Sequence, residues 1–358
     1  MRPFVENLPF LSIFLAIVAG IVCASLRRGI TAYRLTLSAA MVAAIMNAAV
    51  LAYTYLGHLS FTYTMGRFVA PYGNAIKCGP LQGLLSTVFC VVLAMSLVGG
   101  RRDLFHDILP EKQRFYFVMV NLLTASLLAL TYTNDVFTGY VFIEICTIAS
   151  CALVMAKDNG PNMIATIRYL FMSLLGSGLF LIGLALLNSI TGYLLMPSLA
   201  EAVAELAATG RYHLTLTVSI GLIVGGLGIK SAMFPFHLWL PDAHGGAPTA
   251  SSAILSGLVL KGYIALLMTM VVRVFSVELT ASLGVSNILL LFGVLGMIFG
   301  SLGAMREHHI KRMLAYSSVA QIGYIFMGLG LGTLAGVVAS CFHILVHACC
   351  KPLHSVTD

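Results

Sequence analysis

Charge is the scarcest property of this 358-residue sequence, since only 9% of its residues are Asp, Glu, Lys or Arg. Soluble domains carry roughly 25% charged residues, so this composition excludes a water-soluble surface. The sequence also lacks a G-x-G-x-x-G motif, a phosphate-binding loop and a C-x-x-C pair, which are common signatures of nucleotide and cysteine-based metal sites. We therefore expect no cofactor, no bound metal and no redox or catalytic centre in this chain.

Long apolar segments take the place of charge, because 59% of the residues are hydrophobic. Segments of about 20 apolar residues predict membrane-spanning helices, whereas a membrane barrel would show alternating segments of about 10. The sequence predicts an all-α, multi-pass membrane protein. We expect eleven spans, near residues 8–26, 35–57, 80–100, 115–132, 136–156, 165–190, 214–240, 248–273, 284–304, 311–330 and 333–351.

The net charge of +7 is better explained by membrane topology than by nucleic-acid binding. Lys and Arg concentrate in connections that face the cytoplasm. Connections after odd-numbered spans hold twelve basic residues: Arg27, Arg28, Arg34, Arg101, Arg102, Lys112, Arg114, Lys157, Arg168, Arg306, Lys311 and Arg312. The opposite side holds five: Arg2, Arg67, Lys77, Arg211 and Arg273. We expect the N-terminus outside a bacterial-type inner membrane.

Two connections have a structure of their own. Residues 59–64 are predicted to form a short strand on the outer face, and residues 198–206 are predicted to form a short amphipathic helix along the membrane surface. A plain solvated loop helix is the alternative for the second segment.

Four of the 33 acidic and basic residues lie inside apolar segments: Glu144, Lys230, Lys261 and Lys351. A charge at mid-bilayer depth costs about 2.5–3.5 kcal/mol by insertion scales, so such residues usually serve ion transport. Lys230 lies in a pattern that is too long for one span and contains Pro235 and Pro241, which predicts a broken seventh helix. The alternative is a lysine that extends to the membrane surface.

Glu144 is the one carboxylate inside a span, which makes it the expected partner of a buried lysine. Lys261 lies near the middle of the eighth span, where a dry environment favours release of its proton. A purely structural ion pair is the alternative.

The eleventh span places His343, His347 and Lys351 four residues apart, on one helix face. Histidine titrates near neutral pH, so a relay of titratable groups is expected there. A zinc site would need a third ligand, and none is evident. His237 and His244 are further relay candidates, although ordinary histidines at helix ends explain them nearly as well.

These motifs resemble one family. Residues 230–244, KSAMFPFHLWLPDAH, followed by Ala247-Pro248-Thr249, resemble the signature of antiporter-like membrane subunits of respiratory complex I, membrane-bound hydrogenases and Mrp-type sodium/proton antiporters. Residues 310–323, IKRMLAYSSVAQIG, resemble a second family motif, and the run from His343 to Lys351 resembles a third.

The resemblance implies that Glu144 pairs with Lys230 and that Lys261 passes protons onward. It also implies an inverted-repeat fold, with an N-terminal region at 1–114, a first repeat at 115–273 and an incomplete second repeat at 284–358. Family members usually have about fourteen spans, so this chain is expected to be short at its C-terminus.

We expect a subunit that translocates protons, or exchanges sodium for protons, beside other membrane subunits that supply the driving force. Membership of an oxidoreductase or hydrogenase complex stays open, and so does Mrp-type antiport. A non-conducting structural subunit is the main alternative, and a stand-alone transporter of an organic solute is a weaker one.

Overall fold

The computed structural model describes residues 2–64, 74–157 and 159–357, and helices account for most of them. Within these ranges, eleven helices are long and apolar enough to cross a membrane. The predicted all-α, multi-pass architecture is therefore confirmed. Ten spans each contain one long helix: α1 (Arg2–Ser25), α2 (Gly29–Leu56), α3 (Pro80–Gly99), α5 (Pro110–Tyr132), α6 (Val136–Val154), α7 (Gly160–Thr191), α9 (His213–Lys230), α14 (Val285–Arg306), α15 (Ile310–Gly330) and α16 (Leu334–Thr357).

The eighth span is composite and lies at the centre of the bundle. It consists of α11 (Thr249–Ile254), a π-helical segment η4 (Leu255–Val259), α12 (Leu260–Met270) and a second π-helical segment η5 (Val271–Phe275). Ninety-four per cent of its most apolar stretch is buried inside the protein, the highest share among the spans. Other helices therefore shield it from lipid on nearly all sides.

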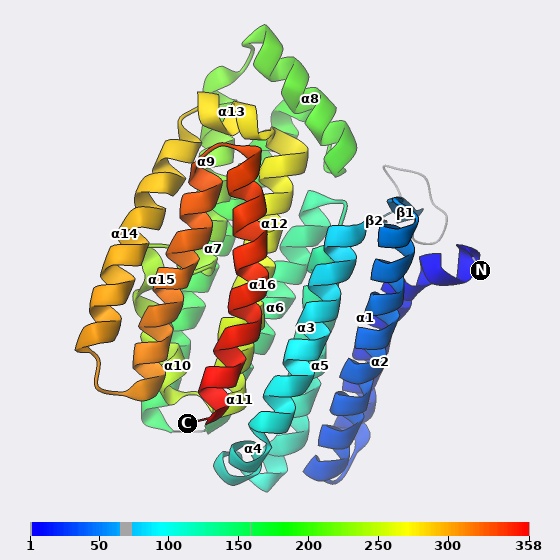
Figure 1. Cartoon of the computed structure of the whole chain (residues 1–358), viewed down its shortest axis with the longest axis vertical. Coiled ribbons are helices and arrows are strands. Elements are labelled where there is room, and N and C mark those ends of the chain that lie inside the picture. Colours follow the sequence, from blue (N-terminus) through cyan, green and yellow to red (C-terminus); the bar gives the residue numbers. More distant parts are fainter. Residues whose placement is uncertain (1, 65–73, 158, 358) are drawn as a thin grey trace.

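Short elements close both ends of the bundle (Figure 1). One end carries β1 (Phe61–Thr64), β2 (Ala75–Cys78), α8 (Met196–Thr209) and α13 (Val277–Ser282). The opposite end carries α4 (Arg101–Asp107), η2 (Met155–Lys157) and the C-terminal end of α16. Because consecutive connections alternate between the two ends, each span crosses the full thickness of the bundle.

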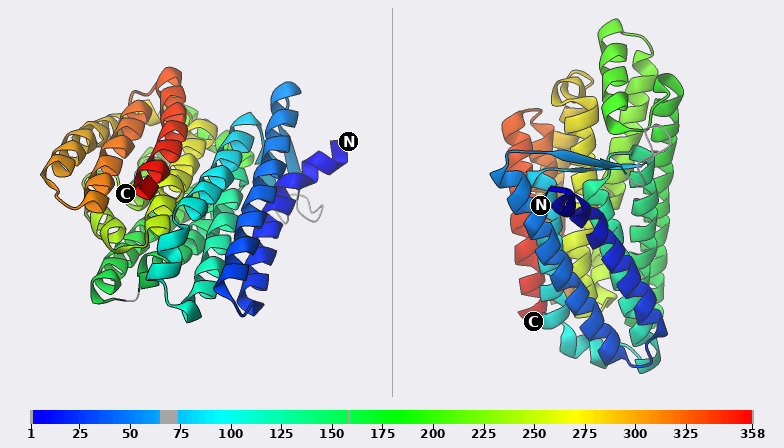
Figure 2. Two further views of the ribbon diagram at one scale, coloured as in Figure 1. Left: turned by 60° about the horizontal axis from the view of Figure 1, so that its bottom comes forward. Right: turned by 90° about the vertical axis from the view of Figure 1, so that its right-hand side faces the viewer.

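The two segments that the sequence singled out contain a strand and a helix, respectively. β1 pairs with β2 in an antiparallel hairpin, with Phe61 opposite Cys78, and the strands lie across the helices at one end (Figure 2). α8 packs against η5 and buries Met196, Leu199 and Val203. These residues recur at helical spacing, which explains why one face of this short helix is apolar.

Local sequence signals set several helix boundaries. Asp135 caps α6 by accepting a hydrogen bond from the Thr138 amide, and Asn159 caps α7 through the Asn162 amide. α7 ends at Gly192, which has a φ of 77°. Glycine adopts this left-handed conformation without the steric penalty that other residues meet.

The seventh span is interrupted directly after Lys230. α9 ends at that residue, the chain turns through residues 231–235, and a 3₁₀ turn η3 (Phe236–Leu238) leads into α10 (Trp239–Gly246). Pro235 lies in the turn, where its missing N–H breaks no helix. The expectation that Pro241 also breaks the helix is wrong, because Pro241 lies in the first turn of α10, where the amide would have no intrahelical partner.

Candidate functional site

Glu144 and Lys230 meet where the seventh span is interrupted. Glu144 lies on α6 and Lys230 is the last residue of α9. The Lys230 Nζ lies 3.5 Å from Glu144 Oε1, and the Lys230 side chain has no exposed surface, whereas that of Glu144 is 24% exposed. The two residues that the sequence paired are therefore in contact, and the carboxylate lies nearer the protein surface.

The Thr147 hydroxyl and the Tyr263 ring are further neighbours of the Lys230 ammonium. The ammonium donates a hydrogen bond of 2.7 Å to Thr147 Oγ1, and it lies 5.4 Å from the centre of the Tyr263 ring. The Tyr263 and Thr147 hydroxyls are 3.4 Å apart. Sequence reasoning missed both residues, although Thr147 follows Glu144 by three positions and so lies on the same helix face.

Close packing of α7 against α9 fixes the position of the lysine stem. A Cβ at Gly226 would lie 2.5 Å from the Gly176 carbonyl oxygen, and one at Gly176 would lie 3.0 Å from Lys230 Cγ. Neither position has room for a side chain. Gly226 lies within α9, and its missing side chain allows this close approach.

Lys261 is fully buried on α12, immediately after the π-helical segment η4. Its Nζ donates a hydrogen bond to the Ser256 carbonyl oxygen within that segment. The Ser256 hydroxyl in turn lies 3.0 Å from that of Ser318 on α15. π-Helical turns are rare in proteins, and those that occur are often found at functional sites. The segment η4 therefore indicates a functional site near Lys261, and the sequence alone did not predict it.

The residues predicted on α16 follow one another at intervals of four along this helix, and two of them are in ring contact. His343 Nε2 lies 2.7 Å from Gln321 Oε1, and the rings of His343 and His347 are stacked with centroids 6.3 Å apart. The Lys351 ammonium donates to the Leu314 carbonyl oxygen at 2.9 Å. His347 is buried, and neither ring nitrogen has a hydrogen-bond partner among the described residues. A buried polar group of this kind needs a hydrogen bond from ordered water or from a neighbouring side chain that moves toward it.

His237 and His244 lie on the segment that follows the break, and both are buried. His244 Nδ1 lies 2.6 Å from the Ser252 hydroxyl on α11, while its Nε2 has no partner among the described residues. His237 stacks on Phe234 at 5.5 Å. His244 is therefore held against the eighth span, whereas His237 contacts the turn beside it.

The predicted residues form two groups. Glu144 and Lys230 make the first, and the second lies about the eighth span and the α16 helix that packs against it, with these members: Lys261, Lys351, His244, His343 and His347. In the described part of the chain, no direct contact joins Lys230 to Lys261. Tyr263, two residues after Lys261 on α12, makes the connection from the eighth span to the first group.

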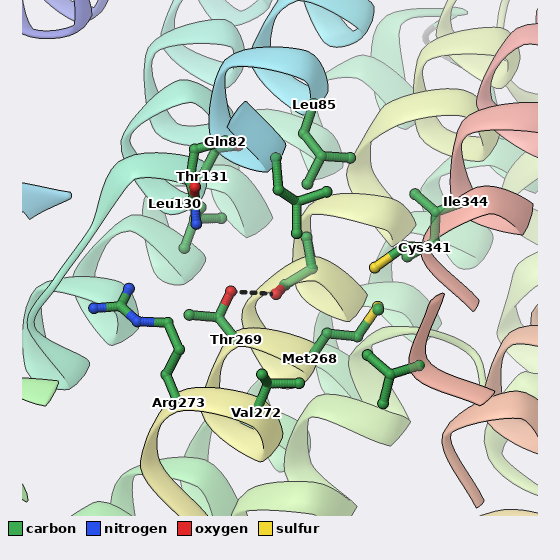
Figure 3. A pocket seen from close by; sticks show the side chains of 13 residues that line it. Gln82, Leu85, Leu130, Thr131, Met268, Thr269, Val272, Arg273, Cys341 and Ile344 are labelled. Carbon is green, nitrogen blue, oxygen red and sulfur yellow. Dashed lines mark hydrogen bonds between the residues drawn. The ribbon is translucent and has the colours of Figure 1, made fainter. Parts of the chain in front are cut away.

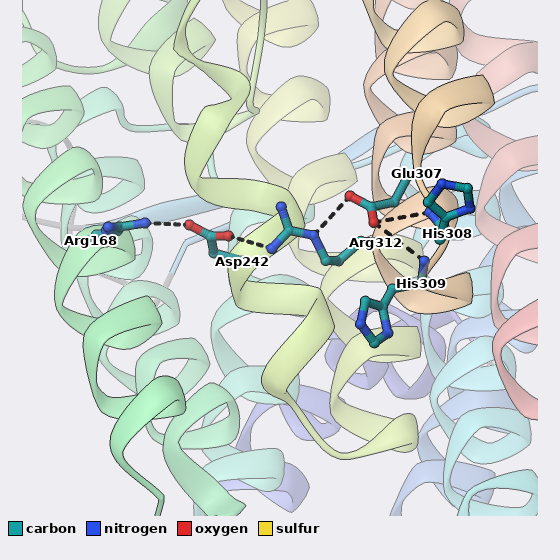
Figure 4. A network of polar contacts seen from close by, with 6 residues as sticks. All are labelled: Arg168, Asp242, Glu307, His308, His309 and Arg312. Atoms are coloured by element: carbon teal, nitrogen blue, oxygen red, sulfur yellow. Dashed lines mark hydrogen bonds and ion pairs between the residues drawn. The ribbon is translucent and has the colours of Figure 1, made fainter.

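An ion-pair network that the sequence did not reveal links three helices and the loop between α14 and α15 at the end of the bundle near α10 (Figure 4). Asp242 binds Arg168 at 2.6 Å and Arg312 at 3.1 Å, and Arg312 also binds Glu307 at 3.0 Å. Backbone N–H groups of the adjacent loop and the Arg312 guanidinium lower the pKa of Glu307. The one indication of this network in the sequence is the Asp242 carboxylate within the 230–244 motif, but the partners of Asp242 lie far from it in the sequence.

An apolar pocket lies between α3, α5, the eighth span and α16 (Figure 3). Its volume is about 120 Å³, and Gln82, Thr131, Thr269 and Arg273 are the polar residues in a mainly aliphatic lining. Arg273 donates to Asn134 Oδ1. The pocket contains none of the predicted path residues, so it is separate from the two groups.

Comparison with known proteins identifies the same family that the motifs suggested. The family model described as NADH:quinone oxidoreductase/Mrp antiporter, TM, matches residues 133–354. NADH-quinone oxidoreductase subunit N of Desulforudis audaxviator is 33% identical over 319 residues, which cover 88% of this chain and 62% of that protein. A Na(+)/H(+) antiporter subunit of Alkalihalophilus pseudofirmus is 30% identical over 289 residues, covering 80% of this chain and 56% of that protein.

Solved structures agree. A chain of the membrane-bound sulfane sulfur reductase, an archaeal respiratory membrane complex, superposes with a TM-score of 0.83 at 27% identity, covering 98% of this chain and 69% of that one. A chain of the Mrp complex from Dietzia sp. DQ12-45-1b gives a TM-score of 0.83 at 23% identity and shares the fold, covering 96% and 63%. This chain therefore belongs to the NADH:quinone oxidoreductase/Mrp antiporter family of antiporter-like membrane subunits.

Proposed function

We propose that this chain translocates protons, or exchanges sodium for protons, as one membrane subunit of a larger complex. The observation that carries the proposal is the Glu144–Lys230 pair, which lies inside the bundle where a spanning helix is interrupted. Interrupted helices at membrane depth are tolerated where they are buried in protein or line a wet cavity, and transporters place their ion sites there.

The proposed path has three parts. Glu144 and Lys230 form the switching pair, because a charged carboxylate holds the lysine protonated and separation of the two favours release of the proton. Lys261 is the central relay. His343, His347 and Lys351 extend the path along α16, and their contacts with α15 and with one another support a continuous row.

The repeat organisation follows from the same reasoning. We propose that residues 115–273 form one antiporter-like repeat, that residues 284–358 belong to a second, and that residues 1–114 flank them. The first contains the interrupted span and the central relay, and the ion pairs of Asp242 with Arg312 join the two proposed repeats. Excess Lys and Arg at the α4 end supports a cytoplasmic location for that end and an external N-terminus.

Substitutions in the assembled complex test the function. Lys230→Ala and Glu144→Gln should abolish most proton movement in inverted membrane vesicles while subunit assembly stays normal. Lys157→Ala, at a surface ion pair with Asp107, is the matched control and should transport like the wild type. Normal transport by assembled Lys230→Ala and Glu144→Gln complexes would overturn the proposal and favour a structural subunit.

The coupling ion is tested on the same vesicles. A proton-only subunit should transport equally well without sodium, whereas an exchanger should require sodium on one side of the membrane. In both cases Lys261→Ala should lower the rate, because the proposed relay serves either ion. The sodium dependence of the wild type then decides between the two modes.

A further inference from the structure

Lys230 is held by a hydroxyl group more closely than by its carboxylate partner. Its ammonium lies 2.7 Å from Thr147 Oγ1 but 3.5 Å from Glu144 Oε1. The second distance exceeds that of a direct charge-assisted hydrogen bond, which is about 2.7–2.9 Å. Glu144 Oε1 is buried and has no hydrogen-bond partner among the described residues. The carboxylate oxygen can therefore accept a hydrogen bond from the Lys230 ammonium, which now donates to Thr147.

The hydrogen bonds of Thr147 leave its oxygen available as an acceptor. The Thr147 hydroxyl donates to the Ile143 carbonyl oxygen at 2.9 Å. A hydroxyl has one donor and two acceptor lone pairs, so both lone pairs remain for the Lys230 N–H and the Tyr263 O–H. Tyr263 is fully buried on the eighth span, and its ring faces the ammonium. Thr147 and Tyr263 thus form a neutral site beside the charged one.

We propose that Thr147, supported by the Tyr263 hydroxyl, is a positioning residue that gives the Lys230 ammonium a second binding position next to Glu144. This inference rests on the proposed function and adds a device for its switching step. Thr147 follows Glu144 by three residues, so both acceptors lie on one face of α6. The Lys230 ammonium lies within 3.5 Å of both acceptors, so a small shift of its terminal atoms carries it from one to the other while the packed stem and both helices stay in place.

Competition between the two acceptors has a kinetic purpose. An ammonium bound only by a carboxylate in a dry site separates slowly, because the charges attract strongly where water is excluded. A neutral oxygen close by accepts the same N–H and lowers the cost of leaving the carboxylate. The tyrosine comes from the eighth span, so the second position also ties Lys230 to the helix that carries Lys261.

Three substitutions in the assembled complex separate this role from simple packing. Thr147→Val keeps the shape and removes the hydroxyl, Thr147→Ser restores a hydroxyl, and Tyr263→Phe removes only the phenolic oxygen. Thr147→Val should slow proton movement about tenfold, a factor equivalent to about 1.4 kcal/mol and close to the value of a hydrogen bond to a charged group. Thr147→Ser should transport within about twofold of the wild type, and Tyr263→Phe should fall between them.

An infrared readout reports the position of the ammonium directly. The carboxylate band of Glu144 is assigned as the band lost in Glu144→Gln. In Thr147→Val this band should shift, because the ammonium then binds the carboxylate alone. Thr124→Val is the matched control: Thr124 is a buried threonine on α5 whose hydroxyl donates to the Val120 carbonyl oxygen. It should change neither the band nor the rate.

The outcomes are distinguishable. Wild-type transport by Thr147→Val, or slow transport with an unshifted Glu144 band, would overturn the positioning role of Thr147. If Lys230→Ala is inactive in the same preparation, the proposed function survives that result. If Lys230→Ala transports normally, the proposed function itself fails, whatever Thr147→Val does.

Discussion

Removal of Glu144 alone should destabilise the protein more than removal of Glu144 and Lys230 together. At 3.5 Å, two unit charges attract by about 4–5 kcal/mol at an effective dielectric constant of about 20. The cost of taking both groups out of water offsets much of this attraction. Breaking a buried pair costs about 3–5 kcal/mol, whereas replacing both partners by apolar residues is often neutral.

The two single substitutions should differ because the partners differ in exposure. Glu144→Leu leaves a fully buried ammonium with Thr147 as its remaining acceptor, so we expect a loss of about 3 kcal/mol. Lys230→Met leaves a carboxylate that is 24% exposed and that water or a proton can relieve, so we expect about 1–2 kcal/mol. The double substitution should lie within about 1 kcal/mol of the wild type, which gives a coupling energy of about 3 kcal/mol or more.

Titration of the solubilised complex with a denaturing detergent would measure these free energies of unfolding. The pair formed by Asp107 and Lys157 is the control, because it lies near the surface, with side chains 19% and 26% exposed. Its coupling energy should stay below about 1 kcal/mol. Equal and additive losses for Glu144→Leu and Lys230→Met would refute the reasoning, since they would mean that the two charges do not depend on each other.

Three further predictions concern the surroundings of the site. Gly226→Ala should destabilise the protein by about 1–3 kcal/mol in the same titration, because its Cβ would lie 2.5 Å from a backbone oxygen, while Gly178→Ala, with open space around it, should be neutral or stabilising. Burial alone would raise the pKa of Asp107, but hydrogen bonds from Lys157 and His106 lower it overall. The stabilisation from this carboxylate is complete above the ordinary aspartate pKa of about 3.9 and is lost as the pH falls below it, so Asp107→Asn should flatten the acid side of a melting-temperature profile; an unchanged profile would contradict the shift. Asp242→Asn should cost about 1 kcal/mol and speed hydrogen exchange in α10, because it weakens both arginine bonds; unchanged exchange would show that packing alone holds this segment.

The sequence was sufficient for the spans and for the charged residues inside them. Long apolar segments and the bilayer thickness leave few alternatives, so the eleven spans matched closely. The small number of intramembrane charges predicted that Glu144 pairs with a buried lysine, and the family resemblance implied that this lysine is Lys230. Buried charges are costly, which makes any such pair conspicuous in a composition that is otherwise apolar.

The sequence was insufficient where contacts join distant segments of neutral residues. Thr147 and Tyr263 look like ordinary residues of apolar helices, and only packing brings the Thr147 hydroxyl to Lys230 and the Tyr263 hydroxyl to Thr147. The position of the helix break also could not be predicted from the sequence, because Pro235 and Pro241 each lack a backbone N–H and each indicates a possible break. In the structure Pro235 lies in the turn and Pro241 lies inside α10.

The π-helical segment before Lys261 has a consequence for how this protein tolerates insertions and deletions. A π turn holds one residue more than an α turn. Deletion of a single residue from η4 would restore ordinary α winding and leave the segments on either side at nearly the same angle, because a π turn and an α turn each complete about one circle. Deletion of a residue from regular α-helix, such as the later part of α12, would instead rotate everything beyond it by about 100°. The π segment is therefore the place in the eighth span where a change of length by one residue is absorbed with the least effect on the directions of Lys261 and Tyr263.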